Sequence, residues 1–223
     1  MSRRRLYLMR HADVAYFDSD GRPMHPDAVT LTAEGIEQAH AAADSLRGIR
    51  FDRVVTSGLP RTLDTARIVA PEPEPESWPE LRELSGGHLE EIPEDELEDA
   101  FTRAFRGKVP LDTRFLDGET VGSLIDRVLP AVERLIADRS WDAALAVLHG
   151  GVNRAILSFA LTGRREYLGG FEQAAACINI LDVGDDWIVR AVNYTPYDPV
   201  HARGRSTTME RLLDLYLPYR RSR

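Results

Sequence analysis

Two histidines and two arginines lie where an α/β protein would use them to bind an anion. Arg10 and His11 directly follow one apolar run, and His149 directly follows another. Arg61 comes soon after a third apolar run, in a segment that begins at Ser57. A guanidinium presents a fork of N–H donors that matches phosphate oxygens, and an imidazole nitrogen can donate or accept a hydrogen bond. If the fold brings these side chains together, they predict a phosphate-binding site.

The elements that must position these residues can be predicted from the spacing of apolar residues. Three apolar runs are typical of buried strands, and each is followed by a segment with helical periodicity. The strand runs are 6–9, 51–56 and 143–148, and the main helices are expected over 32–46, 60–70, 93–107, 120–136 and 151–160. Ligands bind beyond the carboxyl ends of strands in such sheets, so all four side chains are expected in one crevice. Two of the segments also begin helices, whose N-termini attract anions.

The alternation of strands and helices predicts a single α/β domain over residues 1–223. We expect a three-layer α/β/α sandwich with a mostly parallel mixed sheet. Two late apolar runs within 177–192 flank a Gly-Asp-Asp turn and should add an antiparallel hairpin at the edge. The core of the domain is expected over 6–193. The C-terminal tail, 199–223, should hold a short amphipathic helix around 209–217 and receives no chemical role.

Composition and charge exclude several other classes of protein. A formal net charge of -8 and a pI near 5.3 argue against nonspecific binding to nucleic acid or to anionic membranes. No apolar stretch approaches the roughly 20 residues that span a bilayer, and the run after Arg5 is too short for an export signal. The single cysteine, Cys177, lies in an apolar run typical of a buried thiol. We therefore expect a cytoplasmic protein whose partner is a small phosphorylated substrate, and leave a homodimer open.

Five blocks of the sequence resemble, in the same order, those of the histidine phosphatase superfamily, the phosphoglycerate mutase-like proteins. The blocks are Leu6–Ala12, Thr56–Thr62 with Thr65 and Ala66, Leu81–Glu83 followed by Gly87, Leu89 and Glu90, Asp117–Thr120, and Val147–Arg154. Ala12 replaces a glycine that is usual in the family, and Glu91 stands where glycine is common. The resemblance implies a phosphoglycerate mutase-like form of the sandwich and chemistry that needs no cofactor and no metal.

The resemblance also implies a role for each residue of the predicted site. His11 would be the nucleophile that takes the phosphoryl group, and water would then hydrolyse the phosphohistidine. Glu83 would give a proton to the leaving oxygen. Arg10, Arg61 and His149 would neutralise charge on the phosphate oxygens. Since nearby cations disfavour a second positive charge, we also expect a lowered pKa for His11, which keeps the nucleophile neutral.

The outer part of the site and the fate of the phosphoryl group leave alternatives open. Ser57, Tyr16 and Arg22 are candidate substrate-loop residues. The basic residues within 86–115 are a second candidate lining of the outer pocket, although solvent exposure is the slightly favoured alternative for each of them. The segment after His11 lacks residues typical of the mutase branch, which favours hydrolysis of a phosphate monoester. The alternatives are a phosphomutase or phosphotransferase, a catalytically silent phospholigand-binding protein, and a metal hydrolase. The last is disfavoured because the sequence has no close metal-ligand spacing.

Overall fold

The computed structural model describes residues 3–202 and 204–222, and a six-stranded sheet forms its centre. In spatial order the strands are β3 (Glu76–Ser77), β2 (Arg53–Thr56), β5 (Ala143–Leu148), β1 (Arg4–Arg10), β7 (Ile178–Val183) and β8 (Trp187–Tyr194). The first four of these strands run parallel, whereas β7 is antiparallel to β1 and pairs with β8 in a hairpin. The predicted mostly parallel mixed sheet is confirmed, and β8 is the antiparallel hairpin's edge strand.

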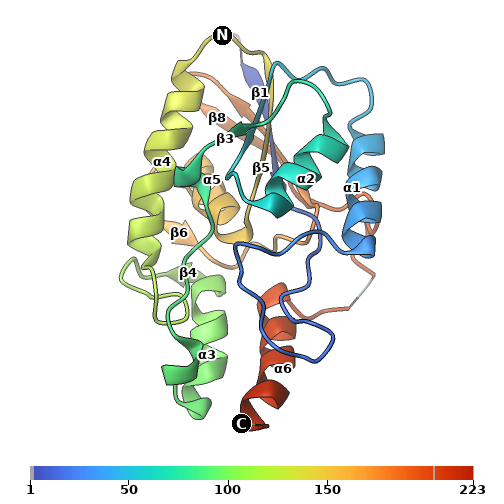
Figure 1. Ribbon diagram of the computed structural model, residues 1–223. Helices are drawn as coiled ribbons and strands as arrows, with labels where there is room; N and C mark the ends of the chain where they lie inside the picture. Colours follow the sequence, from blue (N-terminus) through green and yellow to red (C-terminus); the bar gives the residue numbers. More distant parts are fainter. Residues whose placement is uncertain (1–2, 203, 223) are drawn as a thin grey trace.

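Helices cover both faces of this sheet (Figure 1). One face carries α1 (Ala33–Ser45) and α2 (Pro60–Val69), and the other carries α4 (Val121–Ala137) and α5 (Gly150–Thr162). Side chains alternate along a strand, so β1 serves both layers. Leu6 and Leu8 enter the apolar cluster under α4 and α5, whereas Tyr7 and Met9 enter the cluster under α1 and α2. The three-layer α/β/α sandwich is confirmed.

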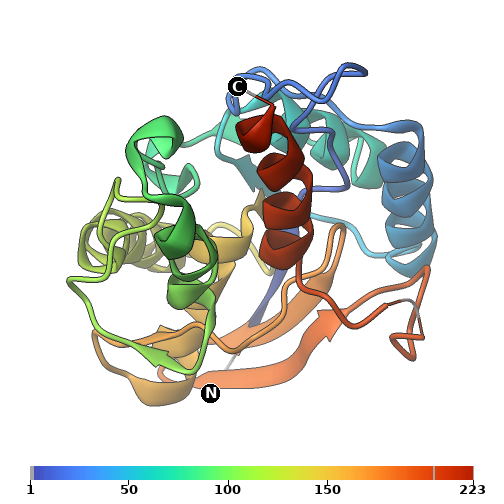
Figure 2. The same cartoon turned by 90° about the horizontal axis from the view of Figure 1, so that it is seen from below.

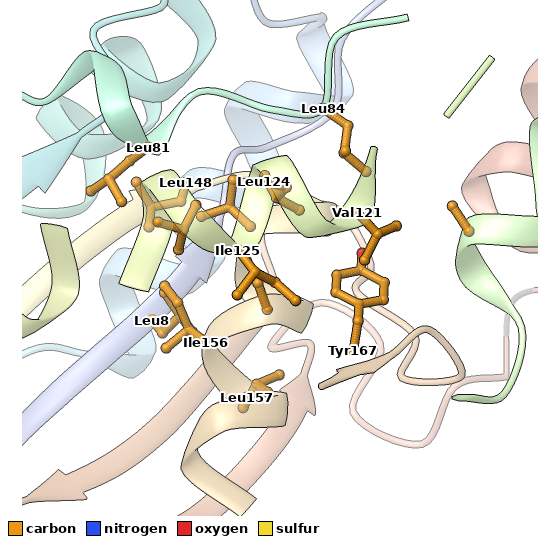
Figure 3. Close-up of a cluster of buried hydrophobic side chains, with 14 of the residues drawn as sticks. Leu8, Leu81, Leu84, Val121, Leu124, Ile125, Leu148, Ile156, Leu157 and Tyr167 are labelled. Carbon is orange, nitrogen blue, oxygen red and sulfur yellow. The ribbon is translucent and has the colours of Figure 1, made fainter. Parts of the chain in front are cut away.

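The cluster between the sheet and α4 and α5 fixes the start of α5 (Figure 3). Leu8 lies beside Ile156 of α5 in that view, and both side chains are almost fully buried. Tyr167 belongs to the short strand β6 (Tyr167–Leu168), is completely buried, and donates a hydrogen bond of 3.3 Å to the carbonyl of Gly151. The packing therefore holds in place the turn that directly follows His149.

The segment between β3 and α4 forms a small, irregular layer beyond the sheet. It consists of 3-10 turns at Pro79–Leu81, Leu89–Glu91, Glu94–Glu96 and Arg103–Phe105, of α3 (Leu97–Thr102), and of β4 (Lys108–Val109), which pairs with β6. The single helix predicted over 93–107 is therefore wrong in its extent. The chain leaves the helical region at Arg106, which is extended, and Gly107 takes a positive φ of 58° that suits glycine.

The C-terminal helix α6 (Thr208–Arg221) is longer than the helix predicted around 209–217 and packs against α3 (Figure 2). The rings of Phe101 and Tyr216 lie 5.9 Å apart between their centroids. Arg220 donates hydrogen bonds of 2.8 Å to the carbonyls of Leu89 and Ile92. These contacts hold α6 beyond the carboxyl ends of the parallel strands. Neither α6 nor any other helix in the described ranges is long and apolar enough to cross a membrane.

Two local expectations differ from the structure. Helical spacing from Ala39, Ala43 and Leu46 would place Ile36 on the apolar face of α1, but this side chain is 42% exposed and Gly35 faces inward instead. A Cβ on Gly35 would lie only 2.2 Å from the carbonyl oxygen of Asp13, so close backbone packing turns the glycine toward the core. Ser57 is of a type that caps helices, but α2 begins with Pro60 and its N-cap is Leu59, which makes no side-chain capping hydrogen bond.

Candidate active site

His11 lies at the carboxyl end of β1 and is only 2% exposed. Its Nδ1 is 2.8 Å from the carbonyl oxygen of Ala12. A carbonyl can only accept, so Nδ1 carries the proton and Nε2 keeps its lone pair. Burial, reinforced by the charges of Arg10 and Arg61, holds the pKa of His11 well below its usual value of 6.5. The ring is therefore neutral at physiological pH, with Nε2 able to act as a nucleophile.

His149 lies at the carboxyl end of β5 and is the N-cap of α5. The centroid of its ring is 5.2 Å from that of His11. Its Nε2 is 2.8 Å from the hydroxyl oxygen of Ser57, whereas its buried Nδ1 has no hydrogen-bond partner among the described residues. Burial first, and then the neighbouring His11 and three arginines, Arg61, Arg10 and Arg127, hold the pKa of His149 well below 6.5. If the Ser57 hydroxyl donates to Nε2, the proton of the neutral ring is left on Nδ1 as a free donor.

Arg10 and Arg61 both direct an unused donor into buried space. Arg10 Nη1 donates to the carbonyl of Gln173 at 2.7 Å and to the hydroxyl of Thr208 at 2.9 Å. Arg61 Nη1 donates to the carbonyl of Pro26 at 2.6 Å. In each guanidinium the buried Nε finds no partner within the described ranges. A buried donor without a partner costs stability, so an anion that accepts from these atoms would be bound favourably.

Glu83 reaches the same place from the irregular layer, between its first two 3-10 turns. Its two carboxylate oxygens accept from the backbone N–H of Gly151 at 3.1 and 2.9 Å, and Oε1 also accepts from the N–H of Leu84 at 2.9 Å. A Cβ on Gly150 would lie 3.7 Å from Glu83 Oε2 and 3.8 Å from Arg10 Nε. The carboxylate and the Arg10 guanidinium are therefore near neighbours across this glycine, at the start of α5.

The structure brings most of the predicted site residues together and leaves one apart. Arg10, His11, Arg61, Glu83 and His149 converge at the carboxyl edge of β1 and β5, with Ser57 behind His149. Tyr16 lines the same cavity as His11, and burial raises the pKa of its hydroxyl. Arg22 does not join them: its side chain is 67% exposed and lies 3.7 Å from Asp20.

The basic residues of the irregular layer are exposed, except for Arg103, which is half-buried. Arg103 pairs with Asp117 at 2.6 Å, and Lys108 pairs with Glu166 at 2.9 Å. Exposed ion pairs of this kind contribute little to stability. Nothing in their geometry directs them toward His11.

The sequence-based reasoning missed the contribution of the C-terminal tail. A cavity of ≈ 450 Å³ opens beside His11, and its walls include Thr208 and Arg211 of α6. Thr208 also binds Arg10 directly through its hydroxyl. The available sequence signal was the capping box at Thr207 and Glu210, which both side chains form in the structure. That signal predicts where α6 begins but not what the helix packs against.

The described residues contain no group of three or more His, Cys, Asp or Glu side chains arranged to hold a metal ion. The buried Cys177 lies behind Arg10, and burial raises the pKa of its thiol to about 12. A thiol that stays protonated is a poor nucleophile. The reactive groups of the site are therefore the two imidazoles, the two guanidiniums and the Glu83 carboxylate.

Comparison with known proteins identifies the class to which this fold and site belong. The model of the histidine phosphatase superfamily (branch 1) matches residues 6–195, and the chain belongs to this superfamily. The sequence is 27% identical over 188 residues to the adenosylcobalamin/alpha-ribazole phosphatase of Escherichia coli (strain K12), covering 80% of this chain and 90% of the relative. It is 31% identical over 150 residues to a probable phosphoglycerate mutase GpmB of Enterobacter sp. (strain 638), covering 65% of this chain and 69% of the relative.

The solved structures agree with the sequence relatives. A putative alpha-ribazole-5'-P phosphatase from Escherichia coli str. K-12 substr. MG1655 superposes with a TM-score of 0.66 at 28% identity, covering 85% of this chain and 96% of that chain. The phosphoglycerate mutase-like fold is thus confirmed. Other relatives are much longer: the chain matches 34% of the 6-phosphofructo-2-kinase/fructose-2,6-bisphosphatase of Gallus gallus, at 29% identity over 169 residues and 74% of this chain.

Proposed function

We propose that this protein is a phosphatase that hydrolyses a phosphate monoester through a phosphohistidine on His11. The observation that carries the proposal is the state of that side chain. The Ala12 carbonyl accepts the hydrogen bond of Nδ1–H, and burial together with Arg10 and Arg61 lowers the pKa of the ring. Nε2 therefore keeps its lone pair, beside guanidinium donors that have no partner among the described residues. This combination suits attack on a phosphorus atom whose oxygens the arginines neutralise.

In the first step, the lone pair of His11 Nε2 forms a bond to phosphorus as the bond from phosphorus to the ester oxygen breaks. The electron pair of the broken bond goes to the leaving oxygen, which takes a proton from Glu83 and departs as an alcohol. Arg10, Arg61 and the Nδ1–H of His149 bind the equatorial oxygens, where a loose transition state carries its charge. The Ala12 carbonyl accepts from Nδ1–H and stabilises the positive ring that results.

In the second step, a water oxygen attacks phosphorus from the side that the alcohol has left. The bond between phosphorus and Nε2 breaks, its electron pair returns to the ring, and Glu83 takes the proton of the water. Inorganic phosphate is released and His11 is neutral again. No metal or oxidant takes part in this balance, and the only co-reactant is water.

The test is turnover of simple phosphate monoesters with and without the nucleophile. We expect His11→Ala to lose at least about 10³-fold in kcat, because the covalent route is closed. His40→Ala is the matched control, since His40 is an exposed histidine on α1. Full turnover by His11→Ala would refute the proposal, as would an equal loss in both variants.

The relationship to probable phosphoglycerate mutases keeps a second function in view. A mutase or phosphotransferase would pass the phosphoryl group from His11 to an organic acceptor instead of water. Turnover in the presence of glycerol separates the two, because phosphate release alone indicates hydrolysis and a phosphorylated alcohol indicates transfer. Measured turnover of either kind would exclude a catalytically silent phospholigand-binding protein.

A further inference from the structure

The ≈ 450 Å³ cavity beside His11 is larger than a phosphoryl group needs. It lies within the range of about 300 to 1,000 Å³ that is usual for small-molecule sites. Arg10 and His11 are among its lining residues, so it adjoins the proposed phosphate site. The rest of the cavity offers space for the organic part of a monoester whose phosphoryl group lies at Arg10 and His11.

The outer walls of the cavity are largely apolar. The loop after β1 supplies Val14, Tyr16 and Phe17, and α6 supplies Leu212 and Leu215. Leu215 is 56% exposed, an unusual position for a leucine at the mouth of a polar site. Apolar side chains on two facing elements favour a ligand that buries apolar surface between them.

The packing of α6 explains why these leucines face the cavity. Leu213 and Tyr216 are buried on the side of α6 that faces the core, and Tyr216 lies against Phe101. Leu212 and Leu215 lie three residues apart on a neighbouring face of the helix. Leu212 is half-buried and also packs against the core cluster, whereas Leu215 is exposed. Contacts from Thr208 to Arg10 and from Arg220 to the irregular layer hold both ends of α6. The leucine face is therefore held in place over the cavity.

The charged groups of the outer cavity do not favour a second anion on the ligand. Asp13 and Asp18 line it together with one further cation, Arg211. The guanidinium of Arg211 donates to the carbonyl of Ser206 at 3.2 Å and to the hydroxyl of Thr208 at 3.4 Å. A second phosphate or carboxylate would thus approach two acidic residues to reach a partly engaged arginine. A neutral, apolar group is not repelled by the two acidic residues.

Resting on the phosphatase function proposed above, we infer that α6 completes a leaving-group subsite for apolar, ring-sized alcohols. The substrates are then phosphate monoesters of apolar or aromatic alcohols rather than of small polar or acidic ones. Leu212 and Leu215 of α6 and Phe17 of the facing loop determine this preference. The α6 part of the subsite, within residues 208–215, lies beyond the part of the chain that matches the superfamily.

Binding of phosphonates tests this inference without relying on turnover. Calorimetry on the full chain would compare benzylphosphonate with methylphosphonate, which share the phosphate-like head and differ in the ring. Burying much of a phenyl ring should make benzylphosphonate bind about tenfold or more tightly. We expect the ratio of the two affinities to fall to about one in the double variant Leu212→Ser/Leu215→Ser. Leu161→Ser is the matched control, because Leu161 is a 50% exposed leucine at the far end of α5.

The outcomes separate the two proposals. Equal affinity for the two phosphonates in the unmodified protein, or a ratio unchanged in the double variant, would overturn the subsite. A clear preference for benzylphosphonate that Leu161→Ser keeps and the double variant loses would support it. If that preference holds while neither benzyl phosphate nor glycerol 1-phosphate is hydrolysed, the phosphatase function fails and the subsite stands. Hydrolysis of glycerol 1-phosphate as fast as benzyl phosphate would count against the subsite alone.

Discussion

At the scale of single residues, the chemistry depends on which nitrogen of His11 carries the proton. The carbonyl of Ala12 decides this, because it accepts from Nδ1 at 2.8 Å. Protonation of Nε2 as well would abolish the nucleophile, and both burial and the neighbouring arginines oppose it. The same arginines that bind the phosphate oxygens therefore also keep the attacking nitrogen free.

The first prediction concerns the titration of His11 in the free protein. Its pKa is depressed, so the neutral ring should persist as the pH falls through 6.5 and gain a proton only well below that value. Between pH 6.5 and the lower pKa of folded His11, the unfolded chain binds a proton that the folded chain does not. The contribution of His11 to the free energy of unfolding is therefore complete above pH 6.5 and declines as the pH falls toward the pKa of the folded state. NMR of the ring nitrogens would measure the midpoint directly. A midpoint at or above 6.5 would contradict this account.

The second prediction separates a proton-transfer role for Glu83 from a merely structural one. Glu83→Gln keeps the size of the side chain but cannot give a proton, so kcat/KM, which reports the first step, should fall by about 10²-fold or more on an alkyl phosphate. The loss of kcat/KM should be much smaller on 4-nitrophenyl phosphate, whose leaving group departs without a proton. Steady-state kinetics on both esters would show the difference. Equal losses of kcat/KM on the two esters would indicate that Glu83 only stabilises its loop and does not transfer a proton.

At the scale of elements, the start of α5 positions both a histidine and a carboxylate. His149 caps the helix, and two residues later the N–H of Gly151 binds Glu83. A Cβ on Gly151 would lie 2.4 Å from Glu83 Oε1. Because Glu83 Oε1 is the end of a flexible side chain, the added methyl group could be accommodated with little loss of stability. The carboxylate, however, would have to move.

The third prediction follows from this contact. Gly151→Ala should fold with nearly unchanged stability yet lose activity in the manner of Glu83→Gln, with the larger loss on alkyl phosphates. Gly170→Ala is the matched control, because a Cβ there would meet no atom closer than 3.4 Å. Thermal unfolding and kinetics on both variants provide the comparison. Normal activity in Gly151→Ala would mean that Glu83 does not depend on this glycine.

At the scale of the whole molecule, two apolar clusters on opposite faces of the sheet hold the strand ends that carry the site. Leu8 lies three residues before His11 in β1 and is fully buried in the cluster under α4 and α5. A rigid β1 is a condition for holding Arg10 and His11 in a fixed position relative to His149, which directly follows the adjacent β5.

The fourth prediction concerns that core. Leu8→Ala should lower the free energy of unfolding by about 2 to 5 kcal/mol through the lost burial and the cavity left behind. Leu161→Ala, at a half-exposed position, should change it by less than about 0.5 kcal/mol. Urea unfolding followed by circular dichroism would measure both. A cost below 1 kcal/mol at Leu8 would show that the core relaxes around the gap.

Much of the fold and the inner site could be predicted from the sequence because local signals carry that information. The apolar runs before His11 and His149 predict buried strands, and residues at the carboxyl ends of parallel strands meet in one crevice. The position of α6 could not be predicted, since periodicity shows which face of a helix is apolar but not what it packs on. Thr208 was therefore missed. The exposed position of Arg22, apart from the other candidates, could not be predicted either, because residue type alone does not show that a loop turns its side chain to solvent.

The most direct test of the account is to trap the covalent intermediate. The protein would be mixed with 4-nitrophenyl phosphate, quenched within milliseconds in alkali, where phosphohistidine survives, and mapped by mass spectrometry. We expect one added phosphoryl group, on the peptide that contains His11, and none in His11→Ala. Rapid turnover with no phosphorylated peptide, or with the phosphoryl group on His149, would contradict it.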